Sequence, residues 1–141
     1  MQELVELAKQ AATKAGLDPA LVCAVCEQES AWNPWAIRYE PGFQKKYIEP
    51  FNLNPTETVT RSISWGLLQL MGECAREIGY KGQFAQLCDP EVGLEWGCKW
   101  FKKKFDKAGG DIKKALLLWN GGGRPEYADE VIARLDRYRG A

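Results

Sequence analysis

The chain has 141 residues, of which 45% are hydrophobic and 27% charged, so it is long enough for one domain with a single buried core. Nineteen basic and nineteen acidic residues cancel, and without a cationic surface for phosphates we expect no nucleic-acid partner. No apolar run approaches the roughly 20 residues that a membrane-spanning helix needs, so we expect no membrane span. The first residues mix acids with apolar side chains and lack the pattern of an export signal.

Helical spacing dominates the predicted elements. Apolar residues recur on one helix face over residues 4–15, and a glycine ends that helix. Asp18 and Pro19 are typical of a helix start, and the helix that they open extends to about Ser30. Residues 34–63 show no sustained period and are predicted to form a long irregular segment, which in a small domain is usually functional. Further helices are predicted over residues 64–78, 90–107, 111–119 and 125–138.

The sequence contains no histidine. This excludes Ser-His and Cys-His nucleophilic catalysis and every zinc site built on imidazole. Acid–base chemistry near neutral pH is then left chiefly to carboxylates, Cys, Tyr and Lys with shifted pKa values. Cys23 and Cys26 form a C-x-x-C inside a helical pattern, but no second close pair of cysteines follows. We therefore interpret the five cysteines as small buried apolar residues and expect no metal site.

One carboxylate stands out by its position. Glu29 lies at the end of an otherwise apolar helix and close to Trp32. Burial in such a setting disfavours the ionised form and raises the pKa of a carboxyl group toward the value that a general acid needs. We therefore expect Glu29 to titrate above an ordinary glutamate, with Trp32 as part of its apolar surroundings.

Three segments support a family resemblance. They are Gln28-Glu29-Ser30 with the following Asn33-Pro34, the run from Ser64 to Met71, and Leu118-Trp119-Asn120-Gly121-Gly122. Together with Tyr127 and Val131, they resemble the soluble lytic transglycosylase (SLT) domain of the lysozyme-like superfamily, over residues 17–135.

The resemblance implies a mainly helical, single lysozyme-like domain over residues 1–141, with a substrate groove. It implies a peptidoglycan-degrading glycosidase that cleaves the β-1,4 bond between N-acetylmuramic acid and N-acetylglucosamine. Glu29 would act as acid and then as base, leaving 1,6-anhydromuramic ends, with no metal or organic cofactor. Such an enzyme would be a monomer acting on the bacterial cell wall, in the periplasm or outside the cell, as an excised domain, a phage-type lysis enzyme or an otherwise delivered protein. The residues expected to bind substrate are Ser64, Gln69, Met71, Trp119, Asn120, Tyr39 and Tyr127.

Two positions depart from the family pattern. Arg38 stands where the family has a serine that contacts the N-acetyl group, and Trp119 stands where it has a tyrosine whose hydroxyl approaches the glutamate. An alternative is therefore a hydrolytic muramidase like the goose-type lysozymes, in which a second carboxylate, Glu40, Glu49 or Glu57, activates water. Glu40 could equally form an exposed ion pair with Arg38. Ser64 could likewise serve as a helix N-cap instead of contacting substrate. A remoter alternative is a non-catalytic module that only binds the cell wall.

Overall fold

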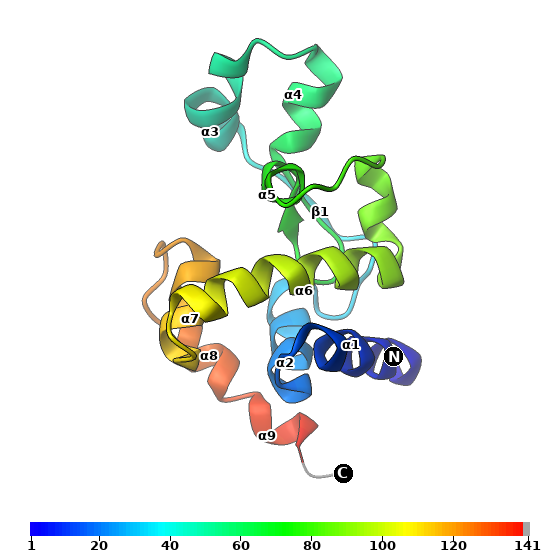
Figure 1. Cartoon of the computed structure of the whole chain (residues 1–141), viewed down its shortest axis with the longest axis vertical. Helices are drawn as coiled ribbons and strands as arrows, with labels where there is room; N and C mark the ends of the chain where they lie inside the picture. Colours follow the sequence, from blue (N-terminus) through cyan, green and yellow to red (C-terminus); the bar gives the residue numbers. More distant parts are fainter. Residues whose placement is uncertain (140–141) are drawn as a thin grey trace.

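The central element of the fold is helix α2 (Pro19–Ser30), in a computed structural model that describes residues 1–139 (Figure 1). Asp18 begins the helix, because its side chain accepts a hydrogen bond from the N–H of Ala20 at 2.9 Å. Residues 20–26 are all buried. Since this helix is apolar on every side, other elements must enclose it.

Five further helices surround α2 and form a helical lobe. The predicted single helix over residues 125–138 is wrong, because the chain bends at residues 133–134 and forms two short helices. This bend lets Arg134 reach the side chains of Glu27 and Gln28 on α2. The other predicted helices of this lobe are confirmed. The surrounding helices are α1 (Gln2–Ala15), α6 (Pro90–Lys107), α7 (Ile112–Asn120), α8 (Tyr127–Ile132) and α9 (Leu135–Tyr138).

A second, smaller lobe contains a three-stranded antiparallel sheet in the order β1-β2-β3. Its strands are β1 (Ile37–Tyr39), β2 (Ile63–Trp65) and β3 (Leu70–Met71). Short helical segments complete the lobe: α3 (Pro41–Phe43), α4 (Pro55–Arg61), α5 (Gly72–Glu77), the π-helical turn η1 (Gln44–Ile48) and the 3-10 turns η2 (Glu49–Phe51) and η3 (Phe84–Cys88). Figure 1 shows this lobe above α6, with the helical lobe below. The segment over residues 34–63 therefore contains more regular structure than its sequence predicts.

The helix predicted over residues 64–78 is also wrong. Gly66 and Gln69 both have positive φ, 75° and 52°, and a helix cannot pass through this backbone conformation. The chain turns back on itself here, so Trp65 pairs with Leu70 and only residues after Met71 are helical. Trp65 and Leu70 then pack into a second core cluster with Phe84, so tertiary burial overrides the local helical spacing.

The cysteines are free thiols that serve in packing. Four are buried and Cys74 is half-buried, and burial raises the pKa of Cys23 to about 11 and of Cys98 to about 12. A thiol with so high a pKa is a poor nucleophile at neutral pH. Within residues 1–139, no group of three or more Cys, Asp or Glu residues lies close enough to hold a metal ion. No helix in the same range is long and apolar enough to cross a membrane.

Candidate active site

The carboxyl group of Glu29, near the end of α2, is held by two donors from the C-terminal part of the chain. The Tyr127 hydroxyl donates to Oε2 at 2.5 Å, and the Trp119 indole Nε1 donates to the same oxygen at 3.2 Å. No hydrogen bond from a residue in the range 1–139 reaches Oε1. The carboxyl group is thus fixed in orientation through one oxygen, and the other oxygen is left to face a ligand.

The surroundings of Glu29 act on its pKa in opposite directions. Burial raises the pKa, whereas the hydrogen bonds from Tyr127 and Trp119 and the nearby charge of Arg38 lower it, and the net effect is an increase. The pKa of Tyr127 is itself raised, first by its burial and then by the charge of Glu29, so this hydroxyl remains a donor. Glu29 therefore has the electrostatic setting of a general acid, together with contacts that stabilise its anion after the proton leaves.

Of the two tryptophans expected near Glu29, Trp119 and not Trp32 donates a hydrogen bond to it. The indole Nε1 of Trp32 donates to the hydroxyl of Tyr138 at 3.0 Å, and the two rings lie edge to face with centroids 6.0 Å apart. Trp119, from the end of α7, contacts the carboxyl group instead. Ala31 and Trp32 both have positive φ, so the backbone turns directly after α2, and the indole N–H of Trp32 is engaged by Tyr138.

The hydroxyl that Trp119 lacks is supplied by Tyr127. This residue was expected to bind substrate, but only 4% of its surface is exposed and its hydroxyl is directed at Glu29. The turn at Gly121 and Gly122, both with positive φ, ends α7 and returns the chain so that α8 packs beside it. The environment of the acid thus keeps a phenolic donor, from a helix further along the chain.

The sheet brings three residues from separate segments into one row. Arg38 is paired with Ser64, and Ser64 is paired with Met71 across the next strand. Side chains that are directly opposite in an antiparallel sheet lie on the same face. The charge of Arg38, at one end of this row, lowers the pKa of Glu29. Ser64 is consequently a strand residue, and the alternative role as a helix N-cap is wrong.

Gln69 and Asn120 have different surroundings. The side-chain amide Nε2 of Gln69 donates to the carbonyl oxygens of Ala36 and Gly66, at 2.9 and 3.0 Å, and thereby holds the turn between β2 and β3 against the start of β1. Asn120 follows Trp119 at the end of α7. Its amide Nδ2 is buried and has no hydrogen-bond partner within residues 1–139, so it is a polar group left unsatisfied beside the acid's donor and not a surface open to a ligand.

The carboxylates considered as a second catalytic group are all engaged. Glu40 forms an ion pair with Arg38 at 3.0 Å, the exposed pairing that the sequence left open. Glu57 is held by Arg61 and Arg76 in the smaller lobe. Glu49 accepts a hydrogen bond from Gln44 at 3.1 Å, and Gln44 in turn accepts one from the Tyr39 hydroxyl at 2.7 Å, so that Tyr39 points toward this loop.

A cluster behind the acid was not predicted. Arg134 donates to Gln28 at 3.0 Å and to Glu27, and Arg137 and Tyr138 also donate to Glu27. Although burial opposes it, these contacts lower the pKa of Glu27, which is therefore an ionised anchor and not an acid. The available signal was the spacing of Arg134, Arg137 and Tyr138, which places three donors on one helical face.

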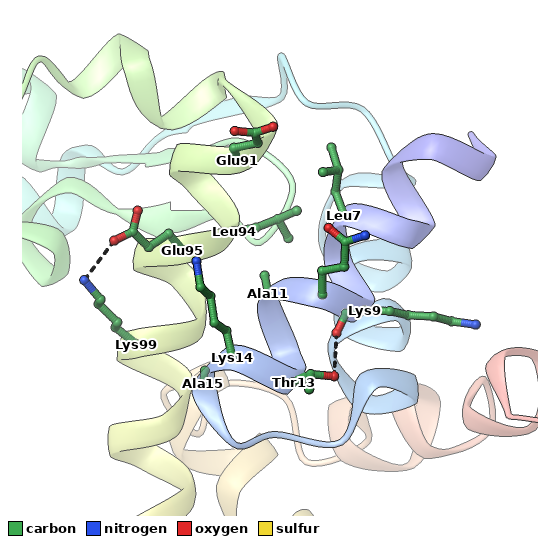
Figure 2. A pocket seen from close by; sticks show the side chains of 11 residues that line it. Leu7, Lys9, Ala11, Thr13, Lys14, Ala15, Glu91, Leu94, Glu95 and Lys99 are labelled. Carbon is green, nitrogen blue, oxygen red and sulfur yellow. Dashed lines mark hydrogen bonds and ion pairs between the residues drawn. The ribbon is translucent and has the colours of Figure 1, made fainter.

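A hollow of about 1000 Å³ lies elsewhere, between α1 and α6 (Figure 2). Its walls mix the cations Lys9, Lys14 and Lys99 with the exposed carboxylates Glu91 and Glu95, and Lys99 is paired with Glu95 at 3.0 Å. None of the residues that contact Glu29 lines it. We therefore place the candidate active site at Glu29.

Comparison with protein families identifies one family for most of the chain. The family model described as the transglycosylase SLT domain matches residues 6–130, which include Glu29, the sheet row and both donors to the acid. No solved structure matches the chain. The mainly helical architecture with one small sheet is that of a lysozyme-like SLT domain. The chain thus belongs to the transglycosylase SLT domain family and is a lysozyme-like glycosidase of the lytic transglycosylase class that acts on peptidoglycan.

Proposed function

We propose that Glu29 is the general acid and base of this enzyme and that cleavage leaves 1,6-anhydromuramic ends. The observation that carries the proposal is the carboxyl group itself. Burial raises its pKa, two donors hold Oε2, and Oε1 receives no hydrogen bond from residues 1–139. Because Oε2 already accepts two hydrogen bonds, the acidic proton resides on Oε1, which is the oxygen free to meet the glycosidic bond.

The reaction follows from this single acid. Glu29 donates its proton to the oxygen that links N-acetylmuramic acid to N-acetylglucosamine, and the C1–O bond breaks. The N-acetyl carbonyl of the muramic sugar stabilises the electron-poor C1. The Glu29 carboxylate then removes the proton of the C6 hydroxyl, whose oxygen bonds to C1 and closes the anhydro ring. Arg38, Tyr127 and Trp119 favour the anionic form of Glu29 that is needed for this second step.

The ion pair of Glu40 with Arg38 supports attack by the C6 hydroxyl of the substrate over attack by water. A hydrolase needs a base that holds water on the sugar face opposite the acid. Glu40 is paired with Arg38 at 3.0 Å, and Met71 on the sheet row has no basic group. The C6 hydroxyl needs no such base, because Glu29 itself accepts its proton.

The site residues divide into two groups under this proposal. We propose that Ser64 and Met71, on the sheet row, contact the sugar rings, whereas the amide Nδ2 of Asn120 is buried and does not reach them in this structure. Trp119 and Tyr127 orient the acid, whereas Gln69 holds the turn next to it. With a wall polymer as substrate, we place the activity at the bacterial cell wall, in the periplasm or outside the cell, and we expect the active form to be a monomer.

Mass spectrometry of digested peptidoglycan tests the proposed product. Purified wild-type protein is expected to release muropeptides whose muramic ends are one water lighter than hydrolysis products. The Glu40→Gln variant serves as the comparison and is expected to give the same anhydro products. Reducing muramic ends in the wild-type digest that disappear in Glu40→Gln would instead establish the hydrolytic muramidase.

Replacing Tyr127 with Phe is expected to move the alkaline limit of activity to higher pH. The hydroxyl stabilises ionised Glu29 and lowers its pKa, so its removal raises that pKa, and the acid keeps its proton to a higher pH. The loss of one orienting hydrogen bond should also reduce kcat by about threefold to tenfold. The pH dependence of kcat/KM measures the shift.

Tyr138→Phe is the matched control for this experiment, because that hydroxyl donates to Glu27 and not to Glu29. The alkaline limb of its kcat/KM profile against pH should coincide with that of the wild type. An alkaline limb that moves equally in both variants, or toward lower pH in Tyr127→Phe, would contradict the assigned contact.

A further inference from the structure

Strand β1 has one unpaired edge. It is the outer strand of the sheet. The backbone groups that point toward β2 belong to even-numbered residues at its two ends: the N–H of Glu40 donates to the carbonyl oxygen of Ser62 at 2.9 Å, and the carbonyl oxygen of Ala36 accepts from the N–H of Gly66 at 2.8 Å. Because alternate residues of a strand point their backbone groups to opposite sides, the N–H and C=O groups of Ile37 and Tyr39 point away from β2.

The side chains along this edge are unusually open for their size. Trp35 is 75% exposed, Ile37 56% and Tyr39 47%. An exposed strand edge flanked by apolar side chains is a template for an added extended chain, and proteins usually cover such edges or place charges along them. Within residues 1–139, no strand pairs with the outer edge of β1.

The same strand is tied to the proposed active site. Arg38 lies between Ile37 and Tyr39, belongs to the row of Ser64 and Met71, and its charge is felt by Glu29. The side chain of Arg38 projects from one face of the sheet and those of Ile37 and Tyr39 from the other, whereas the open edge lies in the plane of the sheet, opposite β2. A muramic sugar held beside Glu29 carries a peptide on its lactyl group, and the open edge of β1 offers that peptide unpaired backbone groups.

We propose that the outer edge of β1 binds the peptide stem of peptidoglycan, with the backbone of Ile37 and Tyr39 pairing with stem amides. This rests on the function proposed above. The added strand draws its affinity from main-chain hydrogen bonds, and the exposed side chains beside it supply apolar contact. The stem-bearing polymer, and not the bare glycan, is then the preferred substrate.

The charges near the edge fit a stem, which carries free carboxylates. Tyr39 is joined to Gln44 at 2.7 Å, and the next residues, Lys45 and Lys46, are exposed and form no ion pair with residues 1–139. Of the acids close by, Glu40 is paired with Arg38, and Glu49 accepts from Gln44. The free cations therefore favour an anionic peptide.

The test removes one outward N–H. Ile37→Pro deletes this donor without touching the ladder to β2, because proline is tolerated on an edge strand where its nitrogen faces solvent. Ile37→Val keeps the N–H and is the matched control. Each variant is assayed on intact peptidoglycan and on glycan strands from which an amidase has removed the stems.

Ile37→Pro is expected to lower kcat/KM on intact peptidoglycan about fivefold, the usual effect of one hydrogen bond, and to leave cleavage of stripped glycan unchanged. Ile37→Val should resemble the wild type on both substrates. An equal loss on both substrates, or no loss on either, would overturn the stem site. If wild type cleaves neither substrate, the proposed function fails, which is a different result.

A second measurement does not depend on catalysis or on the proline variant. A synthetic stem tripeptide, L-Ala-γ-D-Glu-L-Lys, is titrated into the wild-type chain, and the backbone amide resonances are followed by NMR. Shifts at Ile37 and Tyr39 that saturate with peptide are expected. Unchanged resonances at millimolar peptide would overturn the proposal, and so would concentration-dependent dimerisation through this edge, because a second copy would then occupy it.

Discussion

Replacing Glu29 with Gln is expected to reduce the turnover of peptidoglycan by about 10³-fold, within the range of general acid catalysis. Glutamine is close in shape, and its amide oxygen can still accept from Tyr127 and Trp119, so the substitution removes the proton while keeping the contacts. The release of soluble muropeptides from purified walls measures the loss. Glu91→Gln, an exposed carboxylate in the hollow between α1 and α6, is the matched control.

The same variant should be more stable than the wild type at neutral pH. Folding raises the pKa of Glu29, so the favourable state of this group in the folded protein is the protonated one. Its contribution to stability is fully present below the pKa of an unfolded glutamate and is lost as pH rises through the folded pKa. Thermal unfolding at pH 7 and pH 3 should therefore show Glu29→Gln melting above the wild type only at pH 7. Activity that survives in Glu29→Gln, with wild-type melting at both pH values, would remove Glu29 from the proposed role.

Gly66→Ala is expected to lower the free energy of unfolding by about 3 kcal/mol, which combines a left-handed backbone with a steric clash. Gly66 has a φ of +75°, and an added Cβ would lie 2.5 Å from the carbonyl oxygen of Leu87. That oxygen is backbone and has little freedom to move. The measurement is urea unfolding, together with activity, because this turn also positions Gln69.

Gly109→Ala separates the two contributions. Its φ is +68°, close to that of Gly66, but nothing lies within 4 Å of an added Cβ. The free energy of unfolding of Gly109→Ala should therefore fall only by the cost of the left-handed backbone conformation, about 1 to 2 kcal/mol. Equal losses at Gly66 and Gly109 would mean that the turn shifts away from Leu87 at no cost.

The sequence predicted those parts of the fold that local signals determine. Asp18, Asp89 and Asp111 each accept hydrogen bonds from the first turn of the helix that follows them, and each of these helices was predicted. The hairpin of β2 and β3 was missed, because only Gly66 and the positive φ of Gln69 distinguish it from a helix. A glutamine in that conformation gives no signal in a single sequence.

In the candidate site too, the sequence predicted what depends on local signals and missed contacts between distant segments. Glu29 was identified from its own segment, since a carboxylate at the end of an apolar helix is a local pattern. Of its two hydrogen-bond partners, Trp119 followed from the family resemblance, whereas Tyr127 was expected to bind substrate and instead donates to the acid. Contacts between segments so far apart depend on how α7 and α8 pack against α2, and helical periodicity within each segment carries no information about that packing.

The acid and the two donors that hold it are separated by 90 and 98 residues along the chain. A contact of such long range forms only after the intervening elements have collapsed, because the entropy of closing the loop must first be overcome. A growing chain that has emerged only as far as α6 already contains Glu29, but neither Trp119 nor Tyr127 is yet present to orient it. The acid therefore gains the two hydrogen bonds that orient it only when the C-terminal helices dock on α2.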